Sequence, residues 1–304
     1  MVEKKIGAFR LEKKIATGGM GVVYLATFEQ TGQQVALKVL SAQFSNDKNV
    51  VSRFELEMAI LKKLKHPNIM RYFGGEKHGD RRYYAMELMT GGTLDDELKA
   101  KGPFPWERVI QVGLDICAAL EHSHNLGVIH RDLKPANLFI GKEGETKLGD
   151  FGIARDAEST AITSAGKTVG TYAYMAPEQI SGKPAVSGKT DLYALGCVLF
   201  ELLTGRPPFL AKEQAEMLYQ HIDADPPNVR SLAHECPVWL GSFIAKLLKK
   251  DPKDRPFDAL ACQVALEEIR KKVAENVGVT AHTVTGGQTS LGDSIDHYQL
   301  GKLL

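Results

Sequence analysis

The segment His130-Arg131-Asp132-Leu133-Lys134-Pro135-Ala136-Asn137 brings a carboxylate, an ammonium group and a carboxamide together in one short stretch. Phosphoryl transfer uses these three groups: an acid accepts a hydroxyl proton, a cation meets developing phosphate charge, and an oxygen ligand binds Mg²⁺. An ordinary surface turn is the alternative, but this order of eight residues arises rarely by chance. The segment therefore predicts a site for phosphoryl transfer.

This order of residues resembles the catalytic loop of protein kinases, and Lys134 is typical of the serine/threonine-specific branch. The resemblance implies that Asp132 accepts the hydroxyl proton and that Lys134 neutralises the γ-phosphate. It also implies that Asn137 binds Mg²⁺ and that Asp150, in the tripeptide Asp150-Phe151-Gly152, is the second metal ligand. Arg131 belongs to the subset of the family whose members commonly use an activation-loop phosphate to order the site.

The bulk composition fits an ordinary globular protein of 304 residues, with 43% hydrophobic and 25% charged residues. A net charge of +1 gives no reason to expect nucleic acid as a partner. The apolar run at 192–203 is too short to span a bilayer, and the first residues resemble no secretion signal. We therefore expect a cytoplasmic location, where reduced thiols are normal for the four scattered cysteines: Cys117, Cys197, Cys236 and Cys262.

A glycine-rich stretch, residues 16–23, lies between two predicted strands near the start of the chain. Glycines let backbone N–H groups approach phosphate oxygens, although such a stretch is also common in plain turns. Together with the 130–137 segment it resembles the kinase phosphate-covering loop, in which Gly18, Gly21 and Val23 match. Ala16 stands where the first glycine belongs, and a positive φ there would cost about 1 kcal/mol.

Lys38 lies in the apolar strand 35–40 and matches the family lysine that grips the α- and β-phosphates of ATP. A lysine with a buried stem needs an anionic partner. The apolar periodicity of residues 50–65 predicts a helix, and Glu57 on it matches the family's pairing glutamate. Glu55, which is an ordinary exposed helix residue in this interpretation, is the weaker candidate.

Residues 86–92 resemble the hinge at which this family binds adenine, where apolar walls and a few backbone polar groups suit a nucleobase. Backbone groups of Glu87 and Met89 are expected to bond the adenine edge, and Met86 to limit the pocket behind it. The side chains expected to sandwich the ring are those of Val23, Ala36 and Phe139.

The second half of the chain is predicted to be helical, with helices over 107–127, 192–204, 212–222, 238–249 and 258–272. By resemblance, Glu178 forms a buried ion pair with Arg255. Asp191 matches the aspartate that supports the catalytic loop, with a simple helix N-cap as the alternative.

The polar stretch 153–175 resembles an activation segment, in which Thr163, Ser164 and Thr168 are the candidate phosphosites. The alternative is a loop whose hydroxyl groups are not phosphorylated. Thr171 resembles the threonine that closes the platform for the peptide substrate.

The predicted fold is α+β and two-lobed: an antiparallel-sheet lobe with one main helix, and a larger, mostly helical lobe. The predicted divisions are an extension over 1–8, a kinase domain over 9–272 (small lobe about 9–88, large lobe about 89–272) and a linker or tail over 273–304. The last seven residues, 298–304, repeat the pattern of 9–15. Either a truncated second kinase repeat or an accidental apolar tail explains that likeness.

The resemblance implies a bacterial, eukaryotic-like (Hanks-type) serine/threonine protein kinase that transfers the γ-phosphoryl group of Mg-ATP to protein hydroxyls. Its expected partners are ATP and protein substrates, with neither nucleic acid nor a membrane span, and self-association for autophosphorylation stays open. Two alternatives remain: a catalytically inactive ATP-binding scaffold, and a small-molecule phosphotransferase of related fold.

Overall fold

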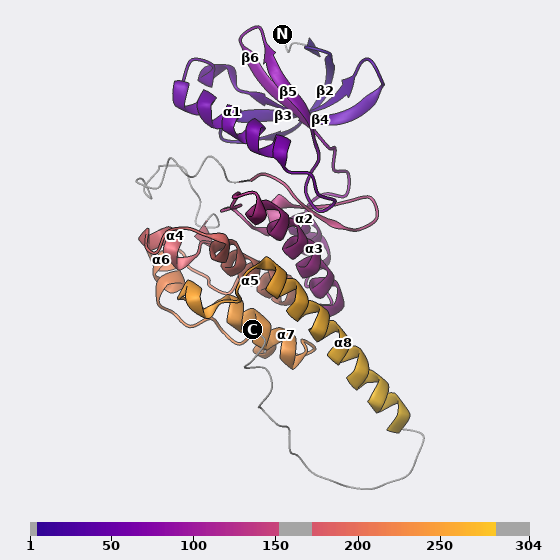
Figure 1. Cartoon of the computed structure of the whole chain (residues 1–304), viewed down its shortest axis with the longest axis vertical. Coiled ribbons are helices and arrows are strands. Elements are labelled where there is room, and N and C mark those ends of the chain that lie inside the picture. The colour runs from indigo at the N-terminus through magenta and orange to yellow at the C-terminus, as the bar shows by residue number, and fades with distance from the viewer. Residues whose placement is uncertain (1–4, 152–171, 284–304) are drawn as a thin grey trace. The chain divides into compact units, whose positions relative to one another are not determined.

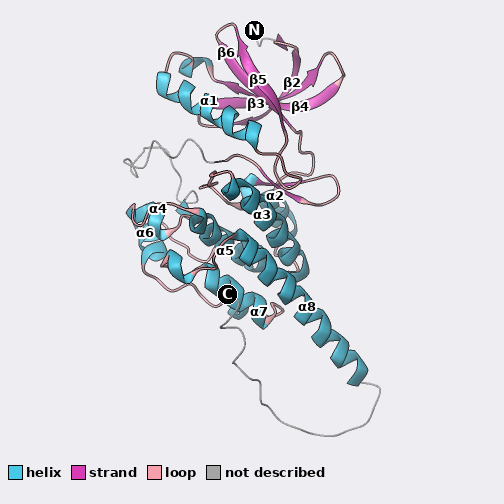
Figure 2. Cartoon of the chain, in the orientation of Figure 1, coloured by secondary structure: helices cyan, strands magenta, loops and turns pink. Residues whose placement is uncertain are grey.

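The computed structural model describes residues 5–151 and 172–283, and within these ranges the side chains up to residue 275 (Figure 1). The chain divides into two units, one formed by Met1–Glu97 with His122–Ser164, the other by Leu98–Glu121 with Ala165–Leu304. All strands that the structure describes lie in the first unit, the sheet unit, and most of the helical residues lie in the second, the helical unit (Figure 2). The predicted combination of an antiparallel-sheet lobe and a helical lobe is therefore confirmed.

The sheet unit contains one antiparallel sheet in the order β1-β2-β3-β4-β6-β5. Its strands are β1 (Lys5–Ile6), β2 (Phe9–Thr17), β3 (Gly21–Phe28), β4 (Gln33–Leu40), β5 (Tyr72–His78) and β6 (Arg81–Met86).

Strand β4 shows how the sheet is built, because its side chains alternate between two faces. Val35, Leu37 and Val39 are buried in a core that also holds Tyr83 and Ala85 of β6. The intervening positions of β4, Ala36 and Lys38, point to the other face. The alternation of one strand thus separates the core from the face that carries the predicted phosphate-binding lysine.

Helix α1 (Lys48–Lys63) confirms the helix predicted around Glu57 and follows a 3-10 turn at Ala42–Phe44. Asp47 caps its start, because the Asp47 carboxylate accepts hydrogen bonds from the backbone N–H groups of Asn49 and Val50. Phe54, Glu57 and Leu61 form the buried side of the helix. Glu57 is therefore carried inward by the same face that packs the helix.

The predicted catalytic segment lies next to a small hairpin of β7 (Leu138–Ile140) and β8 (Thr146–Leu148), preceded by a 3-10 turn at Pro135–Asn137. Leu148 binds the sheet unit on both sides: its N–H donates to the Asn68 carbonyl and its carbonyl accepts from Met70, each at 2.8 Å. These bonds group residues 122–151 with the sheet unit. The predicted boundary between the lobes near residue 88 stays a prediction.

Helices α2 (Leu94–Lys101) and α3 (Trp106–Asn125) each contain a point at which the chain changes from one unit to the other, after Glu97 in α2 and after Glu121 in α3. The remaining helices are α4 (Pro177–Ser181), α5 (Gly188–Thr204), α6 (Gln214–Ile222), α7 (Val238–Leu247) and α8 (Ala259–Thr283), with 3-10 turns at Val229–Ser231 and Pro252–Asp254. Helix α5 is buried from Thr190 to Leu203. Its apolar sequence thus marks the core of the helical unit, and no helix among the described residues is long and apolar enough to cross a membrane.

Two ends of elements differ from the sequence prediction. Lys5–Ile6 pairs with β2 through a turn in which Gly7 has a φ of 54°, and Ile6 is buried, so part of the predicted extension belongs to the sheet. Two residues are too few to show an alternating pattern. Helix α8 continues to Thr283, because no proline follows residue 272 and Gly278 opposes a helix by only about 1 kcal/mol.

Candidate active site

Lys38 and Glu57 form the ion pair that the sequence predicts. The Lys38 ammonium nitrogen donates to Glu57 Oε1 at 2.7 Å, and only 13% and 6% of the two side chains is exposed. At this depth an unpaired charge would be costly, so each residue needs the other. This pair joins strand β4 to helix α1, the next α-helix along the chain.

The Lys38 ammonium group also lies 3.9 Å from Asp150 Oδ1. Burial by itself would lower the pKa of Lys38, but the charges of Glu57 and Asp150, with the hydrogen bond to Glu57, outweigh it and raise that pKa. Lys38 therefore stays a cation. It stands between a structural carboxylate and the more exposed carboxylate of the predicted metal ligand.

The catalytic segment folds so that its three predicted functional side chains meet. Asp132 Oδ2 lies 3.0 Å from the Lys134 ammonium nitrogen. The amide nitrogen of Asn137 donates to the Asp132 carbonyl at 2.8 Å and to Asp132 Oδ2 at 3.2 Å. The carboxylate, the cation and the carboxamide therefore form one cluster within the sheet unit.

His130, which is not among the site residues predicted from the sequence, holds this cluster to the segment that carries Asp150. Its Nδ1 accepts from the Asp132 N–H at 3.3 Å, which leaves the proton on Nε2 to donate to the Gly149 carbonyl at 3.0 Å. The His130 ring also lies 4.6 Å from the ring of Phe151. A buried histidine within the motif was the available signal, but its partners depend on the fold.

The glycine-rich loop connects β2 and β3 as expected, with a hydrogen bond of 2.8 Å from the Gly18 N–H to the Gly21 carbonyl. A Cβ at Gly21 would lie 2.4 Å from the carbonyl oxygen of Val39, so only glycine fits there. Ala16 is not among the described residues with a positive φ, so alanine carries no such penalty. Ala16 pairs with Val23 across the two strands.

The residues predicted to hold adenine lie on the sheet and on the chain that leaves it. Ala36 pairs with Met86 in the sheet register. Beyond the sheet, the Glu87 N–H donates to the Arg71 carbonyl at 2.8 Å, and its carboxylate binds Lys147 at 2.8 Å. Among the described residues, nothing donates to the Glu87 carbonyl or bonds the Met89 N–H, so both backbone groups can serve a nucleobase.

Phe139, the third expected side chain of the adenine pocket, lies on β7 and pairs with Thr93 in an isolated bridge. A Cβ at Gly149 would lie only 2.6 Å from its ring, so this glycine lets the chain pass close to Phe139 just before Asp150.

The two predicted metal ligands offer a carboxamide and a carboxylate, which are the hard oxygen donors that Mg²⁺ prefers. Because the Asn137 amide nitrogen is taken up by Asp132, its Oδ1 is left as the donor atom for a metal. The backbone N–H of Gly149 donates to the Asn137 carbonyl at 3.0 Å and so ties the approach to Asp150 to Asn137. The residues present therefore fit a divalent cation.

Comparison with known proteins identifies the family. The protein kinase domain matches residues 9–266. The chain belongs to the protein kinase family. It is 34% identical over 266 residues to the serine/threonine-protein kinase PknL of Mycobacterium bovis, covering 88% of this chain and 66% of that relative.

Two further bacterial relatives show the same likeness. The chain is 38% identical over 252 residues to the serine/threonine-protein kinase PknB of Mycobacterium leprae, covering 81% of this chain and 40% of PknB. Identity to PknB of Mycolicibacterium smegmatis is 39% over 254 residues, again covering 81% and 40%. The predicted Hanks-type, bacterial serine/threonine kinase domain is thus confirmed, and the chain spans less than two thirds of these relatives' own length.

In the helical unit of the kinase domain, Glu178 and Arg255 form the predicted buried pair. Two guanidinium nitrogens of Arg255 donate to the two carboxylate oxygens at 2.7 and 2.9 Å. Asp191 is buried in the first turn of α5, but the N-cap of that helix is Ser187, so the N-cap alternative is wrong. The predicted support of the catalytic loop by Asp191 stays a prediction.

Several predicted positions lie outside the described residues. They are the glycine of the tripeptide at 150–152, the candidate phosphosites Thr163, Ser164 and Thr168, the platform residue Thr171, and the repeat-like segment 298–304.

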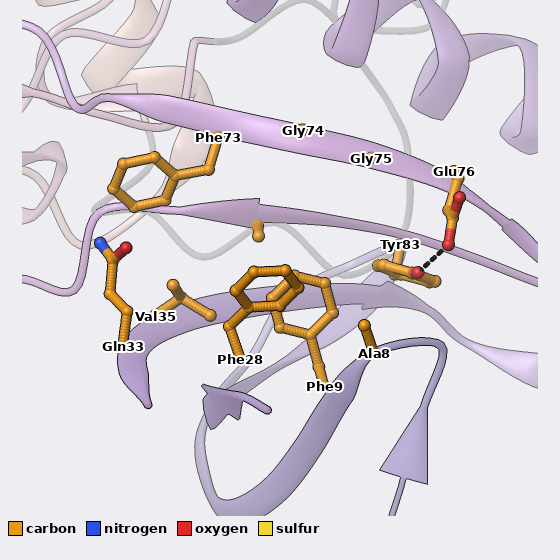
Figure 3. Close-up of a pocket in the computed structure, with 11 residues that line it drawn as sticks. Ala8, Phe9, Phe28, Gln33, Val35, Phe73, Gly74, Gly75, Glu76 and Tyr83 are labelled. Carbon is orange, nitrogen blue, oxygen red and sulfur yellow. Dashed lines mark hydrogen bonds between the residues drawn. The ribbon is translucent and has the colours of Figure 1, made fainter. Parts of the chain in front are cut away.

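A separate hollow lies on the other face of the sheet (Figure 3). Phe9, Phe28, Val35 and Phe73 give it apolar walls, and Tyr83 donates to Glu76 at its edge. Val35 and Lys38 are three positions apart on β4, so their side chains point to opposite faces of the sheet. The hollow therefore does not open toward the Lys38–Glu57 pair.

Proposed function

We propose that this kinase domain transfers the γ-phosphoryl group of Mg-ATP to serine and threonine hydroxyls of proteins. The observation that carries the proposal is the cluster in which Asp132 Oδ2 meets both Lys134 and Asn137. The same unit holds Lys38 between Glu57 and Asp150. A proton acceptor and two cations that can face phosphate are thereby brought into one unit of the fold.

Asp132 is assigned the role of base. A serine or threonine hydroxyl becomes a better nucleophile when a carboxylate accepts its proton during attack, which contributes about 10²–10⁴-fold to the rate. Lys134, 3.0 Å from that carboxylate, is placed to meet the charge of the γ-phosphate. The hydrogen bond from Asn137 fixes the carboxylate orientation, so that the group is positioned before substrate arrives.

Lys38 is assigned the α- and β-phosphates, since it remains charged and is held by Glu57. Gly18 and Gly21 allow the loop backbone to approach the phosphates. Asn137 and Asp150 would hold Mg²⁺, which when bound neutralises phosphate charge. For adenine we propose backbone groups of Glu87 and Met89, with Val23, Ala36, Met86 and Phe139 as apolar surroundings.

The direct test is incubation with radiolabelled ATP and a generic basic protein as acceptor. We expect label on serine or threonine, and a loss of about 10²–10⁴-fold in Asp132→Asn. Glu267→Gln, which alters only an exposed ion pair on α8, is the matched control and keeps full activity. Incorporation that survives Asp132→Asn would refute the assigned mechanism.

The inactive-scaffold alternative makes a different prediction in the same assay. A scaffold would bind ATP tightly but label no protein in the wild-type chain. The residues that bind and react are all present in this chain, namely Lys38, Glu57, Asp132, Asn137 and Asp150, and they favour the active enzyme.

We further propose that phosphorylation at Thr163, Ser164 or Thr168 regulates the site through Arg131, because a phosphate pairs strongly with a guanidinium group. Self-association would allow one copy to phosphorylate another. Equal rates for phosphatase-treated and autophosphorylated protein would refute this regulation. The proposed compartment is the cytoplasm, where the four buried free cysteines stay reduced.

A further inference from the structure

Tyr84 is a fully buried tyrosine whose hydroxyl reaches the Lys38–Glu57 pair. It lies on β6 directly opposite Lys38 of β4 in the sheet register. The Tyr84 hydroxyl donates to Glu57 Oε1 at 2.6 Å, and Lys38 donates to that same oxygen at 2.7 Å. One carboxylate oxygen of Glu57 therefore accepts from two strands of the sheet at once.

We propose that Tyr84 is a positioning residue for phosphoryl transfer: its hydroxyl fixes Glu57 and thereby holds the Lys38 ammonium group and helix α1 in the geometry that binds ATP. The inference rests on the proposed role of Lys38 at the phosphates. Tyr84 touches no reacting atom in this assignment. It acts through Glu57.

The ring of Tyr84 is packed so that its hydroxyl has a defined direction. Phe54 of α1 lies 5.4 Å from the ring and Tyr72 of β5 lies 6.0 Å from it, centroid to centroid. A Cβ at Gly75 would lie 2.6 Å from the Tyr84 Cβ and 2.9 Å from the sulfur of Met58 on α1. Glycine at position 75 thus lets Tyr84 and α1 approach the sheet closely, and the packed ring aims its hydroxyl at Glu57.

The Lys38 ammonium nitrogen also lies 5.6 Å from the centre of the Tyr84 ring. At this distance the ring face attracts the cation, and burial strengthens that attraction. Tyr84 therefore contacts both partners of the ion pair, the carboxylate through its hydroxyl and the ammonium group through its ring.

Tyr84 remains a hydrogen-bond donor at any physiological pH. Burial raises the pKa of its hydroxyl well above the ordinary value, and the negative charges of Glu57 and Asp150 raise it further. Ionisation would place a second negative charge against Glu57. The hydroxyl proton is thus held between the two oxygens, and the bond has the strength of one to a charged acceptor.

Tyr83, the preceding residue on β6, provides a matched control. It is also buried, but it faces the opposite side of the sheet and its hydroxyl donates to Glu76. Tyr83→Phe and Tyr84→Phe delete the same atom from neighbouring positions of one strand. Only the second deletion removes a bond to Glu57.

The experiment measures kcat and KM for ATP in both variants, with radiolabelled ATP and a generic basic protein. We expect kcat/KM for ATP to fall about tenfold in Tyr84→Phe, the usual effect of losing a hydrogen bond to a charged group. In Tyr83→Phe we expect a change below about twofold. Thermal unfolding of both variants, followed by circular dichroism, checks that each one folds.

A background with Glu57→Ala, which removes both carboxylate oxygens, separates positioning from a general loss of stability. If Tyr84 acts through the Glu57 carboxylate, Tyr84→Phe changes kcat/KM by less than about twofold in that background, because the two effects do not add. A merely structural tyrosine would instead lower kcat/KM by the same factor in both backgrounds. That result would overturn the inference, as would equal kinetics for Tyr84→Phe and the wild type.

Lys38→Met separates the proposed role of Lys38 at the phosphates from the proposed role of Tyr84. If Lys38→Met loses activity while Tyr84→Phe behaves as wild type, the role of Lys38 stands and the Tyr84 inference fails. If Lys38→Met keeps full activity, the assignment of Lys38 to the phosphates has failed, and the Tyr84 inference fails with it.

Discussion

Removing the charge of Glu178 tests how far the helical unit depends on its buried ion pair. In Glu178→Gln the guanidinium group of Arg255, fully buried, would lose its counter-charge. Arg255 also donates to the backbone carbonyls of Lys189, Lys249 and Lys250, at 2.8–2.9 Å, and these bonds keep it from turning to solvent. The variant therefore retains a buried, uncompensated charge.

The expected loss of unfolding free energy is about 3–5 kcal/mol, the usual cost of breaking a buried pair from one side. With a urea m-value of about 3 kcal/mol/M, the unfolding midpoint falls by roughly 1–2 M. Both tryptophans, Trp106 and Trp239, lie in the helical unit, so their fluorescence follows the unit in which the pair lies. The fluorescence signal therefore comes from the helical unit alone.

An exposed ion pair on α8 gives the control. Glu267 and Arg270 are a turn apart, and their side chains are 36% and 52% exposed. Glu267→Gln should lower the unfolding free energy by less than about 1 kcal/mol, because solvent already screens this pair. If Glu178→Gln and Glu267→Gln shifted the urea midpoint equally, burial would not be what makes the Glu178 pair important, and the reasoning would be wrong.

Three further predictions concern single residues. Lys38→Met should lower kcat/KM for ATP by at least about 10²-fold, measured with labelled ATP, because it removes the cation proposed to place the phosphates. Gly21→Ala should destabilise the sheet unit by about 1–3 kcal/mol in urea titrations followed by circular dichroism, since its Cβ would lie 2.4 Å from a backbone oxygen. Gly18→Ala, whose Cβ would approach the nearest atom at only 3.8 Å, should cost less. His221, buried beside Tyr193, has its pKa lowered to about 3, mainly by burial. Between about pH 6.5 and 3, His221 is protonated in the unfolded chain but neutral in the folded chain. The free energy of unfolding therefore falls as the pH drops through that window. His221→Gln should flatten this dependence, as read by tryptophan fluorescence.

The residues of the site could be predicted from the sequence because their chemistry is local. The 130–137 segment holds its acid, cation and amide within eight residues, so no knowledge of the fold is needed to see them together. The partner of Lys38 was also predictable, since a buried lysine requires an anion and the periodicity of the next helix offers few. The need of a buried charge for a partner of opposite charge can thus be recognised in the sequence.

The contribution of Tyr84 could not be predicted in the same way. It depends on the register that sets Lys38 of β4 opposite Tyr84 of β6, two strands separated by a helix and another strand. If the register between β4 and β6 shifted by one residue, Tyr83 would lie opposite Lys38 and the side chain of Tyr84 would point into the core. Sequence alternation gives the two faces of each strand but not how two distant strands align.

Backbone strain was the other feature hidden from the sequence. Arg131 and Asp150 are the non-glycine residues with positive φ in the described part of the chain, at 64° and 46°. Such conformations cost about 1–3 kcal/mol each and persist only where the surroundings impose them. Both residues belong to the proposed site: Arg131 directly precedes the proposed base, and Asp150 is a proposed metal ligand.

His130 explains how both strained residues are held at once. Its two ring nitrogens bond the Asp132 N–H, just after Arg131, and the Gly149 carbonyl, just before Asp150. Because the ring is fully buried, neither bond can be exchanged for water. One imidazole thus ties the turn that aims the proposed base to the turn that presents the proposed metal ligand. Each of the two bonds holds the backbone next to one of the strained residues. Because the same ring makes both bonds, the two turns should relax together when His130 is replaced by an apolar residue.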